Sequence, residues 1–175
     1  MDPKIVEKAK KIRMMVMDVD GVLTDGSIIF ASGRQEIKAF FVHDGLGLKM
    51  ARRAGIITAL ISARESEMVT RRASELQISE VHQRVEEKIP IWENLLKKYQ
   101  LLPEHVAMIG DDLTDLPLLL RAGLSIAVAN AVDEVKGRVD HVTSLPGGRG
   151  AVREAVELIL RAQGRYEEEL KKYLP

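Results

Sequence analysis

Short, continuous apolar runs alternate with longer amphipathic segments along most of this chain, and few folds accommodate that pattern. Strands covered on both faces read as continuous apolar runs, whereas helices with one packed face repeat every three to four residues. Strands are therefore expected at Met14–Val19, Ile56–Ile61, Val106–Ile109 and Leu124–Val128, with shorter ones near Val81 and at His141–Thr143. Helices are expected at Gly45–Ala54, Glu65–Leu76, Lys88–Tyr99, Asp115–Ala122, Val132–Lys136 and Gly150–Ala162, the last continuing in charged form toward Tyr173.

The alternation predicts an α/β fold, a Rossmann-like, doubly wound parallel sheet with helices on both faces. The length of 175 residues suits one domain over residues 1–175, with a C-terminal helix and tail over about residues 150–175.

One segment, about residues 26–42, departs from the alternation and reads as an inserted β-hairpin. Its strands are expected at Ser27–Ala31 and Gln35–Val42, around a turn at Ser32-Gly33. The hairpin contains all three phenylalanines of the chain. Such an apolar projection either packs one face on its own domain or needs a partner chain.

Composition excludes several classes of function. The chain has no cysteine, so disulfides, thiolate nucleophiles and cysteine-bound zinc are absent. Lys+Arg and Asp+Glu both total 26, which leaves no net charge to attract nucleic acid. The apolar runs are too short to span a membrane, and Asp18 interrupts the first one too early for a signal peptide. We therefore expect a cytoplasmic protein with no nucleic-acid or membrane partner.

Polar side chains follow the predicted strands at their carboxyl ends, where open α/β sheets bind ligands. Asp18 and Asp20 end the first strand, Ser62 follows the second, and Asp111 follows the strand at Val106–Ile109. We expect these side chains to meet at one edge of the sheet, together with Lys88 at the start of a helix.

This set of residue types suits phosphoryl transfer. Residues two apart on an extended chain point the same way, so Asp18 and Asp20 face a common site. One carboxylate can act as nucleophile and the other as proton donor to the leaving oxygen. A hard cation held by Asp18 and Asp111 would offset the charge of a phosphate, and oxygen ligands favour magnesium over zinc. Lys88 adds positive charge, and the Ser62 hydroxyl adds a hydrogen bond.

Each of these residues also has a purely structural interpretation. Asp-x-Asp-Gly occurs in turns and calcium loops. Ser62 can cap the following helix, Lys88 can be a solvated side chain, and Asp111, Asp112 and Asp115 can complement a helix dipole. Their occurrence in order, each at a strand end or helix start, favours a joint site.

The four segments resemble the motifs of the haloacid dehalogenase (HAD) superfamily of phosphotransferases. The matching stretches are Asp18-Val19-Asp20-Gly21-Val22-Leu23-Thr24, Ser62, Lys88 and Gly110-Asp111-Asp112-Leu113-Thr114-Asp115. The resemblance implies an aspartyl-phosphate on Asp18 and acid/base catalysis by Asp20. It implies a magnesium ion bound by Asp18, Asp111 and the backbone carbonyl of Asp20. Asp112 and Asp115 are then expected to orient Lys88 and metal-bound water.

Superfamily members carry cap domains after the first motif or between the second and third. Here only 26 positions separate Ser62 from Lys88, and the Asp20–Ser62 interval holds a hairpin and a helix. The resemblance therefore implies a capless enzyme whose site is open to water in the monomer.

Among capless members, the chain is similar to the phosphatases of 3-deoxy-D-manno-octulosonate 8-phosphate (KDO 8-phosphate), which act in lipopolysaccharide biosynthesis. The similarity includes the stretches Thr24-Asp25-Gly26, His43 to Lys49, Ile61 to Arg64 and Pro146 to Glu154, with Ala63 where relatives commonly have glycine. It implies a homotetramer whose hairpins associate and help to cover neighbouring sites. The substrate-binding residues that it implies are Asp20, His43, Asp44, Gly45, Leu46, Gly47, Lys49, Arg64, Arg72 and Lys88.

Two alternatives stay open from the sequence. One is a phosphatase for a related nonulosonate phosphate, because such sugar acids differ by few contacts. The other is a non-catalytic HAD-like tetramerisation module of the kind found fused to nucleotidyltransferases, which the intact motif residues argue against.

Overall fold

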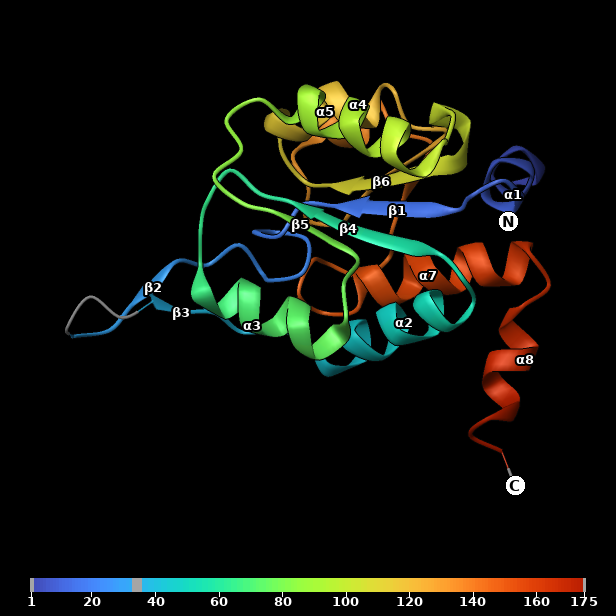
Figure 1. Ribbon diagram of the computed structural model, residues 1–175, viewed down its shortest axis with the longest axis horizontal. Coiled ribbons are helices and arrows are strands. Elements are labelled where there is room, and N and C mark those ends of the chain that lie inside the picture. The colour runs from blue at the N-terminus through green and yellow to red at the C-terminus, as the bar shows by residue number, and fades with distance from the viewer. Residues whose placement is uncertain (1, 33–35, 175) are drawn as a thin grey trace.

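The computed structural model describes residues 2–32 and 36–174 and is built around a six-stranded sheet (Figure 1). In spatial order the strands are β5 (Glu80–His82), β4 (Ile57–Ile61), β1 (Met14–Met17), β6 (Val106–Gly110), β7 (Leu124–Ala127) and β8 (His141–Val142). All neighbouring pairs run parallel. The predicted parallel α/β fold is confirmed.

Helices cover both faces of the sheet. Figure 1 shows α2 (Val42–Arg53), α3 (Glu67–Leu76) and α7 (Ala151–Ala162) on one face, and α4 (Lys88–Tyr99) and α5 (Leu116–Leu119) on the other. Every residue of β1 and β6 is buried, which explains why these strands read as continuous apolar runs. Further helical elements are α1 (Pro3–Lys10), α6 (Asp133–Lys136), α8 (Tyr166–Lys171) and the 3₁₀ turns η2 (Pro103–His105) and η3 (Leu113–Asp115).

The strand order places the central strands β1 and β6 at the point where the chain reverses its winding direction. From β1 the chain proceeds outward through β4 to β5, then returns to β6 on the other side of β1 and continues to β8. The register pairs Met17 with Ile109, so the residues after β1 and β6 emerge side by side. Ligands bind in the crevice outside the carboxyl ends of strands at such a switch point.

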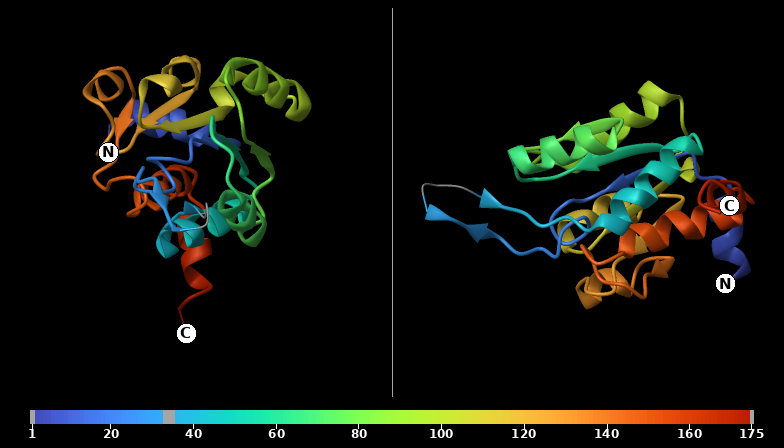
Figure 2. Two further views of the ribbon diagram at one scale, coloured as in Figure 1. Left: turned by 90° about the vertical axis from the view of Figure 1, so that its left-hand side faces the viewer. Right: turned by 90° about the horizontal axis from the view of Figure 1, so that it is seen from below.

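The hairpin projects from the body of the molecule (Figures 1 and 2), but it is shorter than expected. Its strands are β2 (Ile29–Phe30) and β3 (Glu36–Ile37), which pair antiparallel. The expected strand Gln35–Val42 is wrong beyond Ile37, because residues 38–41 have no regular secondary structure and Val42 already begins α2. Gln35, its expected first residue, lies outside the described residues. Of the expected Ser32-Gly33 turn, Gly33 lies outside the described residues.

Three helical segments also differ from expectation. The helix α1 was not predicted, although Asp2 caps it by accepting the Lys4 N–H at 2.8 Å and Pro3 begins it. The helix expected at Asp115–Ala122 is the turn η3 followed by the short α5. The charged tail is a separate helix, α8, because Gly164 adopts a left-handed φ of +69° after α7. Among the described residues, no helix combines the length and apolarity needed to cross a membrane.

Candidate active site

Four aspartates that follow the two central strands, β1 and β6, line one pocket. Asp18 continues the ladder beyond β1, with its N–H donating to the Ile109 carbonyl at 3.1 Å. Gly21 then turns the chain with φ +98°, and a Cβ at this position would overlap the Asp111 carboxylate. The glycine therefore permits the close approach of the Asp18–Asp20 turn to Asp111. The pocket measures about 160 Å³ and is lined by Asp18, Asp20, Ser62, Ala63, Arg64, Lys88, Asp111, Asp112 and Thr114.

Lys88 lies at the centre of the buried charges. It is the first residue of α4, and its Nζ donates to Asp18 Oδ1 at 2.6 Å and to Asp115 Oδ1 at 2.7 Å. Asp115 is fully buried, and its Oδ2 accepts the Asp111 N–H at 3.0 Å. Asp115 thus links Lys88 to the backbone of Asp111.

Two carboxyls of this cluster, Asp18 and Asp111, hold protons more tightly than ordinary aspartates because their pKa values are raised. Burial and the charge of Asp115 raise the pKa of Asp18 to about 6, although Lys88 opposes the shift. Burial and the charges of Asp115 and Asp18 raise the pKa of Asp111 to about 7. Burial alone would lower the pKa of Lys88, but Asp18 and Asp115 outweigh it and the pKa is raised. The cluster therefore has more negative charge than Lys88 can neutralise.

The cluster fits a hard divalent cation. Carboxylate oxygens of Asp18, Asp111 and Asp115 all lie within 4.8 Å of one another. Both oxygens of Asp115 are already engaged, by Lys88 and by the Asp111 N–H. Asp18 and Asp111 are therefore the side chains best placed to bind the ion, and their oxygen donors suit magnesium.

Thermal unfolding in chelator is expected to begin at lower temperatures as the pH is raised from about 5 to about 8. In the folded chain the carboxyls of Asp18 and Asp111 have pKa values of about 6 and about 7, whereas an unfolded aspartate has a pKa of about 4. The folded state then binds more protons, so its free energy of unfolding falls as the pH rises. Scanning fluorimetry should show that magnesium reduces this fall and that Asp111→Asn flattens it. An unchanged pH slope in Asp111→Asn would contradict the assignment.

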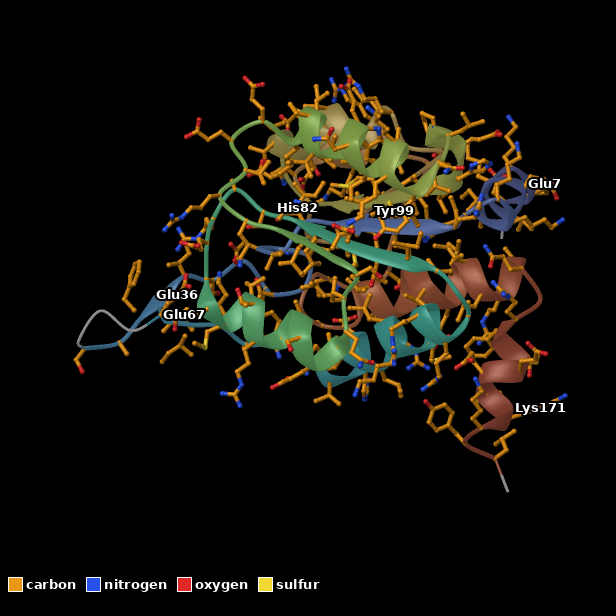
Figure 3. The ribbon with its side chains drawn as sticks, viewed as in Figure 1. Glu7, Glu36, Glu67, His82, Tyr99 and Lys171 are labelled. Atoms are coloured by element: carbon orange, nitrogen blue, oxygen red, sulfur yellow. The ribbon has the colours of Figure 1, made fainter. Side chains whose placement is uncertain are left out.

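The hairpin contributes two residues that sequence reasoning missed. Lys38 is buried and forms ion pairs with Asp20 and, at 3.6 Å, with Glu36. Arg64 Nη2 donates to Glu36 at 2.9 Å, and Arg64 Nε lies 3.6 Å from Asp20. Glu36 lies where the hairpin meets the start of α3 (Figure 3). The available signal was the i, i+2 spacing of Glu36 and Lys38, which puts both on one face of a strand.

Ser62 and Asp112 line the pocket and also shape its loops. The Ser62 hydroxyl accepts the Arg64 N–H at 3.2 Å, which supports the turn after β4. Asp112 accepts the Leu113 N–H at 2.7 Å and caps η3. Its side chain bonds to a local amide rather than to Lys88.

The structure places the other expected substrate-binding residues outside this pocket. His43, Asp44, Gly45, Leu46, Gly47 and Lys49 all lie in α2. Asp44 is buried against the start of α7, and His43 packs edge-on against Phe41 at 4.8 Å. Arg72 lies over Phe40 and 3.3 Å from Glu75. It lines a second pocket of about 280 Å³ with Lys38, Phe40, Val42, Met68, Arg71 and Glu75.

Comparison with known proteins agrees with this geometry. Residues 52–152 match the family of haloacid dehalogenase-like hydrolases. The chain is 43% identical to the 3-deoxy-D-manno-octulosonate 8-phosphate phosphatase of Salmonella typhimurium, over 95% of this chain and 88% of that protein. The phosphatase of the same name from Moraxella catarrhalis, solved with magnesium, phosphate and KDO, has a TM-score of 0.96 and 44% identity, covering 99% of both chains. That of Yersinia pestis has a TM-score of 0.93 and 40% identity, covering 94% of this chain and 89% of the other.

The family match extends over more than half of the chain and the similarity to its relatives over nearly all of it. The resemblance predicted from the motif residues is confirmed, and this chain belongs to the haloacid dehalogenase-like hydrolases.

Proposed function

We propose that this protein is a magnesium-dependent phosphatase that hydrolyses KDO 8-phosphate to KDO and inorganic phosphate, a step in lipopolysaccharide precursor biosynthesis. One observation carries the proposal. The pocket formed by Asp18, Lys88 and Asp111 occurs in a chain that is 44% identical, over 99% of its length, to a phosphatase solved with magnesium, phosphate and KDO.

In the proposed reaction Asp18 attacks phosphorus and forms an aspartyl-phosphate. Lys88 holds Asp18 Oδ1 at 2.6 Å, which leaves Oδ2 to act as nucleophile. Asp20 donates a proton to the leaving sugar oxygen and then takes one from the water that hydrolyses the intermediate. Magnesium, bound by Asp18, Asp111 and the Asp20 carbonyl, supplies positive charge for the phosphoryl oxygens. Lys88 and the Ser62 hydroxyl add further stabilisation.

The sugar acid is proposed to extend from the phosphate pocket toward the second pocket. Arg64 borders the first pocket and Arg72 the second, while Lys38 lies between them beside Asp20. Cationic side chains at both ends suit a substrate with a phosphate and a carboxylate. The substrate-binding role of residues 43–47 and of Lys49 stays a prediction.

The function is tested by comparing kcat/KM across phosphate esters, with magnesium and with chelator. The kcat/KM for KDO 8-phosphate should be higher than the kcat/KM for a nine-carbon sugar-acid phosphate, for glucose 6-phosphate and for p-nitrophenyl phosphate. Chelator should abolish the hydrolysis of all four esters. A preference for the nine-carbon substrate would favour a nonulosonate phosphatase instead. No metal-dependent release from any ester would favour the non-catalytic module.

We further propose a cytoplasmic, capless enzyme of one domain that assembles as a homotetramer through its hairpins. The hairpin exposes apolar side chains well away from the core, including Phe30, which is 75% exposed, with Ile28, Ile29 and Ile37 about half exposed. Apolar surface concentrated on a projecting edge is typical of an interface between chains.

The substitution Phe30→Glu is expected to dissociate the assembly, because it puts a charge into the proposed hairpin contact. Sedimentation velocity should detect a shift from tetramer to smaller species. The control Leu102→Glu changes a residue that is 59% exposed in the loop before η2, away from the hairpin, and should leave the mass unchanged. An equal mass for wild type and Phe30→Glu would exclude the hairpin as the contact.

A further inference from the structure

We propose that Asp44 and the glycines of the Pro146–Gly150 loop are positioning residues that hold the Asp18–Thr24 turn in its reactive geometry. The inference rests on the proposed phosphatase function. It assigns Asp44 a role different from the substrate contact expected for it from the sequence.

The Pro146–Gly150 loop packs directly against the backbone of the Asp18–Thr24 turn, called the nucleophile turn below because it contains Asp18. A Cβ on Gly147 would overlap the Gly21 carbonyl, and a Cβ on Gly148 would overlap the Thr24–Asp25 peptide. The Gly148 N–H donates to the Val22 carbonyl at 2.9 Å. Two backbones at this spacing leave no room for a methyl group, so a side chain at Gly147 or Gly148 must displace the turn.

A displacement of the Asp18–Thr24 turn would also move the reacting groups, because they lie in this turn or in contact with it. Gly21 also lies directly against the Asp111 carboxylate, since a Cβ on Gly21 would overlap that side chain. Asp18 and Asp20 lie immediately before Gly21 in the same turn. Nucleophile and metal-binding carboxylate would therefore move relative to each other, and small misplacements of reacting groups are costly.

Asp44 anchors the other end of the loop. It is only 1% exposed, and its two oxygens accept the Arg153 N–H at 2.8 Å and the Gly150 N–H at 3.2 Å. A buried carboxylate is retained where hydrogen bonds offset its loss of hydration, and the first turn of α7 provides them. At the near end, Asn130 Oδ1 accepts the Gly147 N–H at 2.8 Å. The loop is thus held at both ends by side chains.

The location of Asp44 favours a positioning role over a direct contact with substrate. Asp44 does not line the pocket formed by Asp18, Lys88 and Asp111, and its oxygens accept the backbone N–H groups of Gly150 and Arg153 instead. A positioning residue affects every substrate alike through kcat, whereas a substrate contact affects KM for the sugar acid alone.

The experiment compares two glycines with the same backbone strain. Gly148 and Gly164 have φ values of +63° and +69°, but a Cβ on Gly164 would meet nothing within 4 Å. Gly148→Ala should lower kcat by about 10²-fold for both KDO 8-phosphate and p-nitrophenyl phosphate, with KM changed by less than about threefold. Calorimetry should also show weaker magnesium binding. Gly164→Ala should keep wild-type kcat and magnesium affinity.

Asp44→Asn provides an independent test if Gly148→Ala does not fold. An amide keeps the volume but offers one acceptor oxygen for two N–H groups, so kcat should fall equally for both substrates. The inference is overturned if Gly148→Ala loses no more kcat and magnesium affinity than Gly164→Ala. It is also overturned if Asp44→Asn changes only KM for KDO 8-phosphate. An inactive wild-type enzyme that still binds magnesium, with binding weakened in Gly148→Ala, would refute the proposed function but not the positioning.

Discussion

Asp18→Asn is expected to lower kcat by at least about 10⁴-fold while the protein remains folded. An amide of the same shape cannot attack phosphorus, so no aspartyl-phosphate forms. The substitution also removes one of the like charges facing Asp111 and Asp115, which should raise the melting temperature in chelator. Steady-state release of phosphate and scanning fluorimetry measure the two effects.

The matched control is Asp133→Asn, which makes the same chemical change at a side chain that is 94% exposed on α6. It should leave kcat and stability close to those of the wild type. Magnesium-dependent turnover by Asp18→Asn at a substantial fraction of the wild-type rate would rule out the covalent mechanism, whatever the stability result.

Lys88→Met is expected to destabilise the magnesium-free protein by about 3–5 kcal/mol, because removing one partner of a buried ion pair leaves uncompensated charge. Here the partners left behind are Asp18 and Asp115, both buried beside Lys88 Nζ. The loss of a positive charge next to the phosphoryl group should also reduce kcat by about 10²–10³-fold. Urea unfolding in chelator and phosphate release measure these effects separately.

Lys98→Met tests whether the loss is specific to the buried site. Lys98 lies in the same helix, α4, and pairs with Glu80 at the surface, with 60% of its side chain exposed. Exposed pairs of this kind contribute about 0–1 kcal/mol, so Lys98→Met should retain both stability and activity. Similar losses in the two variants would indicate a general effect on α4.

The parallel sheet was predictable because its central strands are buried on both faces. Met14–Met17 and Val106–Gly110 have no exposed residue, so their apolar runs need no information about neighbouring strands to be recognised. The meeting of Asp18 with Asp111 followed from the same reasoning, since parallel strands bring their carboxyl ends to one edge.

The hairpin strands were predicted too long because their ends depend on contacts between distant residues rather than on a local apolar pattern. Residues 38–41 have the composition of a strand, but the Lys38 side chain is buried in ion pairs with Asp20 and Glu36. The ladder with β2 ends where Ile37 pairs with Ile29, and residues 38–41 lead into α2 without regular secondary structure. An ion pair between residues 18 positions apart leaves no periodic signal in the sequence.

The sequence by itself determined the alternation of strands and helices around a parallel sheet, the residues at the strand ends and the chemistry that those residue types allow. Only the tertiary structure decided what supports them: the Lys88–Asp115 link, the contact of Lys38 with Asp20, and the packing of Gly147 and Gly148 under the nucleophile turn. The pattern of apolar residues along a short segment indicates which side chains of that segment are buried, so burial can be recognised from neighbouring positions in the sequence. Support for a site comes from contacts between distant segments, and these exist only once the sheet has brought the segments together.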